Sequence, residues 1–579
     1  MDLHPQLNRL ETTGLLRLAQ VQPDLEYLFR HALVQDAAYA SLLKADRKWL
    51  HRVVGETLER LYPDRLDELA PLLARHFQGA GAPDQARYYF TRAADGALSH
   101  YANAEAERYY RAALALAEPG GGRAGLLAGL GEALANQSRF ADALATWRAA
   151  IDLYAAAGDA DHVARLYARS ARVAADAGDP PWSLRLAQEG LAALAGGAET
   201  RGQAALLRTA ASAYHLNGRS ADALPLCRQG LALAERLGDR EEQAESLTTL
   251  GLLPNQPVAA QMAALTRAVE LAESAGLLAA AARAHNNLAV IIENSVGDLA
   301  AARDHYQRAV ALARRRGSAA HELLYLHNVI SVALWSGDLA GAGSTIAAGR
   351  ELLRTLGQPA EGTRALRLSE AALLRYRGEL GEALRRLRAC QAGAQLHGDL
   401  QISGIATNYL AEILFEQGDW PAAAGALDDA LAISDQGLGW GGVEPRCLLS
   451  AVYARQGEAA GAQRLLDAAR AQAGDAPGPY EAKVLALAAG RLALAEGRRD
   501  AALAAFADAA ALDARLGMPW YRARTLQEWA AAHLARGTVA DYDRTVTLLQ
   551  EALAIFEQIG VPYYAGLVRA QLPSRRPEG

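Results

Sequence analysis

The sequence is poor in the residues that form cross-links and metal sites. It has only three cysteines, Cys227, Cys390 and Cys447, which are odd in number and far apart. They therefore predict neither a disulfide framework nor a spaced set of metal ligands. The residues after Met1 lack the basic start and apolar core of a signal peptide, and charges interrupt the Ala-rich stretches well before about 18 residues. We expect a cytoplasmic protein with no metal, no cofactor and no membrane contact.

Lysine is almost absent as well. Lys44, Lys48 and Lys483 are the only lysines among 59 basic residues, and no dense basic stripe interleaved with aromatics is present. Neutralisation of nucleic-acid phosphates would require such a stripe, so nucleic-acid binding is disfavoured. No Gly-x4-Gly-Lys-Ser/Thr loop, His-Glu-x-x-His pair or Gly-x-Ser-x-Gly elbow occurs. We predict that the chain is not an enzyme and has no catalytic residues.

The sequence is rich in Ala, Leu and Gly. Apolar residues make up 51% of the chain but aromatics only 6%, a composition dominated by strong helix formers. The 52 glycines are expected at helix ends. A turn recurs about every 40 residues, at Gly178-Asp179, Gly218-Arg219, Gly297-Asp298, Gly337-Asp338, Gly378-Glu379, Gly418-Asp419, Gly457-Glu458, Gly497-Arg498 and Gly537-Thr538. Pro254-Asn255-Gln256-Pro257 supplies the missing turn, and Ser138-Arg139 extends the series.

Two series of small residues keep register with these turns. One precedes each turn, at Gly131, Ala171, Ala211, Gly251, Ala289, Ser331, Ala371, Ala411, Ser450, Gly490 and Ala530. The other follows the turn, at Ala143, Ala223, Ala302, Ala342, Ala383, Ala423, Ala462 and Ala502. Two helices approach closely only where small side chains meet at their crossing. Each unit is therefore predicted to be a helical hairpin, in which helix A ends at the turn and helix B follows it.

This pattern resembles the tetratricopeptide repeat (TPR) over roughly residues 120–570, although the period exceeds that family's usual length of about 34 residues. The resemblance implies an all-α fold, a right-handed superhelical α-solenoid of about eleven to twelve TPR-like hairpins with an irregular helical N-terminal cap. Residues nine positions after the turn, such as Trp147, Cys227, Tyr306 and Phe506, are predicted to be core.

The N-terminal segment differs from the repeats. Apolar spacing predicts a helix over residues 27–43, and another helix follows over 44–61. The run from Phe29 through His31 and Leu33 to Tyr39 resembles the end of the ATPase module in bacterial STAND-type regulators, including those linked to a class III nucleotide cyclase. The resemblance implies a helix and short strand within residues 7–21. It also implies that His31 could sense the state of a nucleotide. The alternative is a capped or partly buried helical histidine.

These observations divide the chain into four predicted parts. Residues 1–66 form the ATPase-like helical remnant, and residues 67–122 form an irregular transition in which Asn103 caps a helix. The solenoid occupies residues 123–572. A disordered tail occupies residues 573–579.

The A helices of such arrays line the concave face, so polar and aromatic residues at inward registers are candidates for a ligand groove. Three of them are asparagines at equivalent points, and a ladder of amides can hold an extended peptide backbone. The alternative is an ordinary solvated face. The candidates are Arg208, His215, Arg283, Asn286, Tyr325, Asn328, Trp335, Arg375, Tyr376, Asn408, Glu412, Phe415, Arg455, Arg491 and Gln527.

We therefore expect a non-catalytic sensor and protein-interaction module. It would bind a peptide, protein or small effector in its concave groove and couple this event to a linked ATPase or cyclase-type signalling protein. A passive assembly scaffold and the repeat arm of a bacterial transcription activator are the alternatives.

Overall fold

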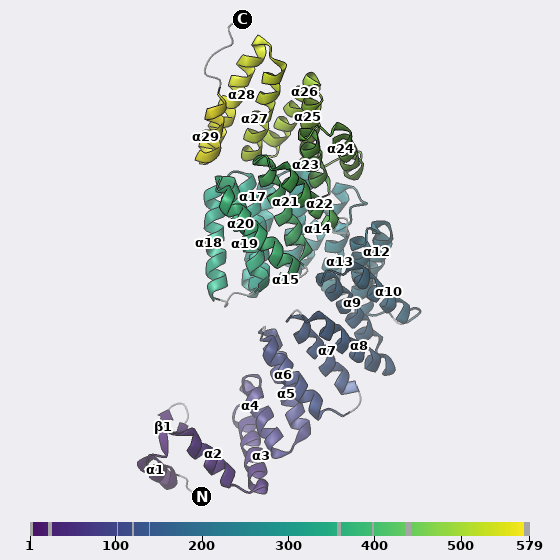
Figure 1. Ribbon diagram of the computed structural model, residues 1–579. Coiled ribbons are helices and arrows are strands. Elements are labelled where there is room, and N and C mark those ends of the chain that lie inside the picture. The colour runs from purple at the N-terminus through teal and green to yellow at the C-terminus, as the bar shows by residue number, and fades with distance from the viewer. Residues whose placement is uncertain are drawn as a thin grey trace. The chain divides into compact units, whose positions relative to one another are not determined.

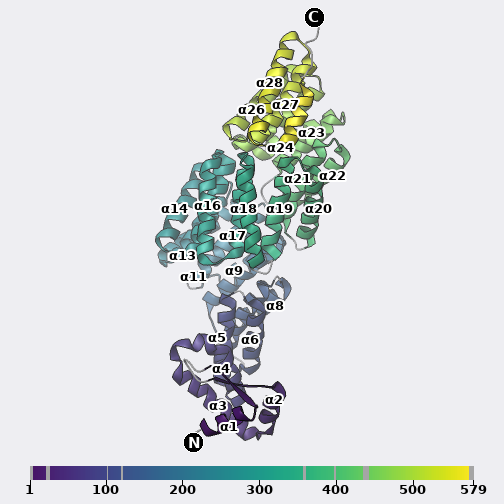
Figure 2. The same cartoon turned by 90° about the vertical axis from the view of Figure 1, so that its left-hand side faces the viewer.

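The computed structural model describes residues 4–20, 26–100, 102–118, 121–137, 139–197, 199–355, 360–396, 399–434 and 442–572. Contacts divide the chain into two compact units, Met1–Asp159 and Ala160–Gly579 (Figures 1 and 2). This division lies one hairpin beyond the predicted boundary at residue 122, because α7 packs on α6 as well as on α8. The predicted tail at 573–579 lies outside the described residues.

The first unit is helical apart from one small hairpin. Its elements are α1 (His4–Thr12), β1 (Leu16–Gln20), β2 (Glu26–Phe29), α2 (Ala32–Ser41), α3 (Lys44–Leu61), the 3-10 helix η1 (Pro63–Arg65), α4 (Leu66–Ala80), α5 (Pro83–Ser99), α6 (Asn103–Leu116), α7 (Gly121–Ala135) and α8 (Phe140–Ala156).

Two predictions for this unit are wrong. The expected helix over residues 27–43 begins only at Ala32, since Glu26–Phe29 pairs antiparallel with Leu16–Gln20 and Leu16 lies opposite Phe29. Aromatic and apolar residues suit such a strand, and period alone does not separate a short strand from a helix. Asn103 does not cap α6 either. It is the first helical residue, and Ala102 occupies the cap position.

The second unit is an α-solenoid of TPR-like hairpins (Figure 1). Odd-numbered helices are the A helices and even-numbered ones the B helices. The helices are α9 (Ala160–Asp176), α10 (Pro180–Ala193), α11 (Arg201–Leu216), α12 (Ser220–Arg236), α13 (Arg240–Leu252), α14 (Val258–Ser274), α15 (Leu278–Ile291), the π-helix η2 (Ile292–Val296), α16 (Leu299–Arg316), α17 (Ala319–Trp335), α18 (Leu339–Thr355), α19 (Ala360–Arg377), α20 (Leu380–Leu396), α21 (Leu400–Glu416), α22 (Trp420–Ser434), α23 (Val443–Arg455), α24 (Ala459–Ala473), α25 (Pro479–Ala495), α26 (Arg499–Arg515), α27 (Pro519–Arg536), α28 (Val539–Gln558) and α29 (Pro562–Gln571).

The small residues lie at the helix crossings, as predicted. Every alanine of the helix-B series is completely buried. A Cβ added to Gly490 would lie only 2.9 Å from the Phe506 ring, and one added to Gly131 would collide with Trp147. Trp147 and Phe506 belong to the series nine residues after the turn, so that series packs against the small residue of helix A. The recurring turn glycines adopt positive φ, for example +79° at Gly418. Glycine adopts this conformation without a steric cost, which explains why glycine recurs at these turns.

Within the second unit the array returns on itself. The turns that follow α15–η2, α17 and α19 face the starts of α25, α27 and α29, five hairpins later. Gly297 faces Pro479, Gly337 faces Pro519, and Gly378 faces Tyr563. We call these three pairs the seam. Two hydrogen bonds cross near the seam. One joins residues that are 145 positions apart in the sequence, and the other joins residues that are 189 positions apart.

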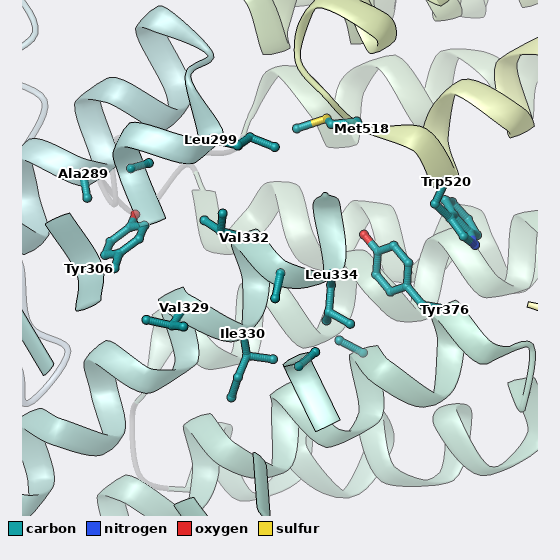
Figure 3. Packing of buried hydrophobic residues seen from close by; sticks show 14 of the residues in the cluster. Ala289, Leu299, Tyr306, Val329, Ile330, Val332, Leu334, Tyr376, Met518 and Trp520 are labelled. Atoms are coloured by element: carbon teal, nitrogen blue, oxygen red, sulfur yellow. The ribbon is translucent and has the colours of Figure 1, made fainter. Parts of the chain in front are cut away.

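A single hydrophobic cluster extends across the seam (Figure 3). It includes Leu299 and Val332 on one side and Met518 and Trp520 on the other, all almost completely buried. Figure 3 places Tyr376 of α19 next to Trp520 of α27, and their ring centroids are 5.0 Å apart. Side chains from both sides of the seam therefore pack against one another in the interior of α15–α29. Among the described residues, no helix is both long and apolar enough to span a bilayer.

We expect Ala411→Leu to lower the free energy of unfolding by roughly 1 to 3 kcal/mol, because Ala411 is completely buried at a helix crossing and extra methyl groups would overpack it. Urea denaturation followed by circular dichroism measures this loss. The matched control is Ala471→Leu, at an exposed position of α24. Equal stability of the two variants would contradict the assignment of the crossing.

Candidate functional site

A cavity of about 80 Å³ lies inside the returning part of the second unit. Five A helices, α19, α21, α23, α25 and α27, supply its walls. Its lining residues are Arg375, Glu412, Phe415, Glu416, Glu444, Cys447, Leu448, Lys483, Val484, Leu487, Arg491, Trp520, Tyr521, Arg524, Thr525 and Glu528. The A helices thus line the inner side, as the repeat register predicts. Charged and aromatic side chains dominate the lining, which is unusual for a space this enclosed.

Arg375 and Lys483 are the most deeply buried cationic side chains of the cavity. The Arg375 side chain is only 2% exposed, and its Nη2 donates to Glu416 Oε1 at 3.0 Å and lies 2.8 Å from Glu412 Oε2. Burial opposes the charged form, but the two carboxylates outweigh it and raise the pKa of Arg375 further. Its Nε and Nη1 are buried without a hydrogen-bond partner among the described residues. Two strong donors are therefore available in the interior.

Trp520 supplies a third unpaired donor. Its indole is 1% exposed, its ring centroid lies 4.8 Å from the Arg375 guanidinium carbon, and its Nε1 has no partner among the described residues. An unpaired buried donor costs about 1 to 3 kcal/mol. Three such donors surround one space. A polar ligand or an ordered water in that space would supply their missing acceptors, which would explain why they are buried.

Glu412 carries an abnormal carboxyl group. Burial is the main cause that raises its pKa to about 7, and the carboxylates of Glu444 and Glu416 add to the effect, while Arg375 opposes it. Glu444 lies on the next A helix, α23, and accepts a hydrogen bond from Tyr480 Oη at 2.7 Å. The carboxylates on this side of the cavity therefore disfavour the negative charge of Glu412, and this side favours a proton or another positive group.

Two further ion pairs complete the lining. Arg491 donates through both Nε and Nη2 to Glu528, and its guanidinium carbon lies 4.9 Å from the Phe415 ring centroid. Lys483 is 2% exposed, with its Nζ 3.7 Å from Asp513 Oδ1 and 3.9 Å from the Tyr521 ring centroid. Arg491 and Lys483 already have ion-pair partners, so they determine the shape of the cavity more than they offer donors to a ligand.

Four of the predicted site residues line the cavity: Arg375, Glu412, Phe415 and Arg491. Four more lie in its packed surroundings. Tyr376 is completely buried and donates through its Oη to Tyr521 Oη at 3.1 Å. Trp335 stacks on Tyr480 with centroids 5.8 Å apart, and Gln527 donates to Gln571 at 3.1 Å. Asn408 has a buried Oδ1 without a partner among the described residues.

The predicted residues of earlier repeats lie outside the cavity, and most of them pair with nearby side chains. Arg208 donates to Glu242 of the next A helix at 2.6 Å, and Arg283 pairs with Glu245. Burial lowers the pKa of Arg283 to about 9. His215 lies 2.8 Å from Ser220 Oγ through Nδ1, and Tyr325 is 3% exposed.

The asparagine ladder is only partly formed. Asn328 Nδ2 donates to Asn286 Oδ1 at 2.8 Å, and Asn286 Nδ2 donates to the neighbouring Asn287. Asn408 is not joined to this pair by any hydrogen bond in the described chain. Because the amides are partly used by each other, a three-rung clamp for an extended peptide is not present in this conformation.

Two predicted residues stand apart from the others. Arg455 is exposed near the end of α23. His31 is exposed and occupies the N-cap position of α2, where its side chain makes no capping hydrogen bond. The alternative prediction is a capped or partly buried helical histidine. His31 does occupy a cap position, but its imidazole is exposed and makes no capping hydrogen bond.

Sequence reasoning missed Glu444, Lys483, Trp520, Tyr521 and Glu528 as site residues. A signal for some of them was present: only the last three A helices begin with a proline followed by aromatics, at Pro479-Tyr480, Pro519-Trp520-Tyr521 and Pro562-Tyr563-Tyr564. These starts form one side of the seam. Lys483 is also the only lysine of the repeat array.

No protein-family model and no curated protein matches the chain. Solved helical structures are similar at low identity. The crystal structure of the APC/C hetero-tetramer Cut9–Hcn1 matches with 14% identity and a TM-score of 0.41, over 84% of this chain and 91% of that one. A Rap protein complexed with competence and sporulation factor matches with 12% identity and a TM-score of 0.43, over 60% and 98%.

Aspartyl phosphate phosphatase F from Bacillus subtilis matches with 9% identity and a TM-score of 0.42, over 59% of this chain and 93% of that one. Similarity this distant carries no information about ligand or activity.

We expect the pH dependence of stability to change in Glu412→Gln. The pKa of Glu412 is about 7 in the folded chain and about 4.3 in an unfolded one, so the folded state binds the extra proton between these values. Stability from this group is therefore lost as pH rises through that window. Glutamine does not titrate.

Between pH 5 and 8 the native chain should lose about 2 to 3 kcal/mol relative to the variant, measured by urea denaturation at each pH. Glu293 has a pKa raised to about 7 by burial, but it contributes equally to both chains. Glu458→Gln, at an exposed position, is the control and should follow the native profile. Parallel profiles for Glu412→Gln and the native chain would refute the assignment.

Proposed function

We propose that this chain is a non-catalytic sensor module that binds a small polar effector in the cavity between α19 and α27. The observation that carries the proposal is the set of buried, unpaired donors on Arg375 and Trp520. Side chains that pay a desolvation cost without a partner are explained if a ligand supplies the missing acceptor. A reaction would need a nucleophile or general base positioned by an orienting group. Arg375, Lys483 and Arg491 of this cavity are engaged in ion pairs instead.

A small effector is favoured over an extended peptide for this part of the array. Aromatic rings from both sides of the seam pack against one another beside the cavity, and the cavity itself holds about 80 Å³. A peptide several residues long would need the seam to open. A protein or peptide partner remains compatible with the outer surface, whose chemistry gives no specific support for one.

The seam offers a route from binding to signalling. Stacked repeats contact only their neighbours, so a solenoid bends as a spring. Here α19 supplies Arg375 and α27 supplies Trp520, which are brought together only when the array returns on itself. A ligand that contacts both helices binds the closed state better than an open one and therefore shifts the equilibrium toward closure.

We further propose that the output is a linked ATPase or cyclase-type signalling protein. This part rests on the resemblance of residues 1–66 to the end of a STAND ATPase module. Leu33, Leu43 and Trp49 of that segment are 82%, 71% and 62% exposed, which is consistent with a surface that another domain covers.

The seam can be opened without changing any cavity residue. In Gly337→Ala the new Cβ would lie 2.8 Å from Ile559 and 2.9 Å from Pro519, at a backbone φ of +78°. Gly418→Ala introduces the same kind of strain at φ +79°, but nothing lies within 4 Å of its Cβ. The second variant therefore controls for the backbone cost.

We expect native mass spectrometry of the full chain, incubated with a small-molecule cell extract, to detect a bound compound in the native protein and in Gly418→Ala but not in Gly337→Ala. Small-angle X-ray scattering should record a larger radius of gyration only for Gly337→Ala. No retained compound in the native chain, or equal retention in both variants, would refute the proposal.

A further inference from the structure

Two charged groups that line the cavity have no ion-pair partner among the described residues. Glu444 on α23 accepts one hydrogen bond, from Tyr480 Oη. Arg524 on α27 has Nη1 3.4 Å from Gln527 Oε1, and its guanidinium carbon lies 5.7 Å from the Tyr564 ring centroid and 6.0 Å from that of Trp520. One unpaired carboxylate and one unpaired guanidinium therefore face a common space.

The unpaired donors gather around Trp520. Its own Nε1, together with Nε and Nη1 of Arg375, lacks an acceptor, and Arg524 lies on the same α27 helix one turn away. Nitrogen donors in this number, two of the three groups cationic, match a carboxylate, which accepts through two oxygens. This side of the cavity is suited to a single small anion.

The unpaired acceptors gather on α21 and α23. Glu412 Oε2 is buried without a hydrogen-bond partner among the described residues, and Glu444 also lines the cavity. The pKa of Glu412 is raised to about 7, chiefly by burial and further by the carboxylates of Glu444 and Glu416. An ammonium group between Glu412 and Glu444 would relieve the repulsion and supply N–H donors to both. The acidic side is therefore suited to a primary amine.

The complete lining holds four basic side chains and four carboxylates. A polyanion such as a nucleoside triphosphate would meet as many repelling charges as attracting ones. A molecule with one charge of each sign would satisfy both unpaired groups at once, and a volume of about 80 Å³ restricts it to a few heavy atoms.

We infer that the cavity binds a small zwitterion of the α-amino acid class, with its carboxylate toward Trp520, Arg375 and Arg524 and its ammonium toward Glu412 and Glu444. The inference rests on the proposed function of the same cavity and specifies its ligand. The aromatic walls made by Phe415 and Tyr521 would contact the side chain of the amino acid.

The test is isothermal titration calorimetry of the full chain with a panel of the twenty free amino acids. Each amino acid that binds is compared with its N-acetyl derivative, which lacks the ammonium, and with its amide, which lacks the carboxylate. A third comparison uses a dipeptide that contains the same amino acid. We expect at least one free amino acid to bind and the first two derivatives to lose roughly tenfold or more in affinity. If the dipeptide binds with equal strength, the site is assigned to a short peptide, and the inference of a free amino acid is overturned.

A matched pair of variants separates a ligand contact from a structural effect. Trp520→Phe removes the Nε1 donor but keeps a ring beside Arg375. Trp529→Phe is the control, because Trp529 lies on the same helix, also has an Nε1 without a partner, and does not line the cavity. We expect Trp520→Phe to weaken amino-acid binding roughly tenfold while the chain stays folded at the temperature of the titration, and Trp529→Phe to bind as the native chain does.

The inference is overturned if no amino acid binds, if the N-acetyl or amide forms bind equally well, or if the two Trp variants bind alike. None of these results depends on the seam experiment, which asks only whether any small molecule is retained. A retained compound that is not a zwitterion would leave the sensor role standing and remove this ligand class.

Discussion

The close crossing of helices A and B in each hairpin is the constraint on which the rest of the structure depends. It requires a residue no larger than alanine on one or both helices, and buried Ala411 and Ala423 meet that requirement in one unit. Where the small residue is glycine, an aromatic ring such as Phe506 occupies the space that a Cβ would need. Because every unit repeats this crossing, the hairpins stack in one register along the chain, and in the second unit the stack returns on itself.

Most of the repeat fold could be predicted from the sequence, because it depends on contacts between neighbouring hairpins. Turn glycines at positive φ, small crossing residues and buried residues nine positions later all follow from a local register. The N-terminal β-hairpin could not be predicted in the same way. Leu28 and Phe29 satisfy either period over a short stretch, and pairing with Leu16–Gln20 decides between them.

The site was predictable only in part. Arg375, Glu412, Phe415 and Arg491 follow from the inward register of their own helices. Trp520 and Tyr521 join them only through the return of the array, which brings α27 to α19 across four hairpins. The proline and aromatic starts of the last three A helices are the one local sign of this return. Charges expected in solvent are buried, and burial is what alters the pKa of Glu412.

The seam also constrains how this array could change over evolutionary time. In an ordinary solenoid a hairpin can be duplicated or deleted, since each new unit finds the same neighbours. Here Gly297, Gly337 and Gly378 each face one particular helix start. Insertion or loss of a single unit between them would shift all three pairs by one hairpin and place glycine turns against the wrong surfaces. The number of repeats between the two sides of the seam is consequently fixed, so this part of the chain is inherited as one indivisible block.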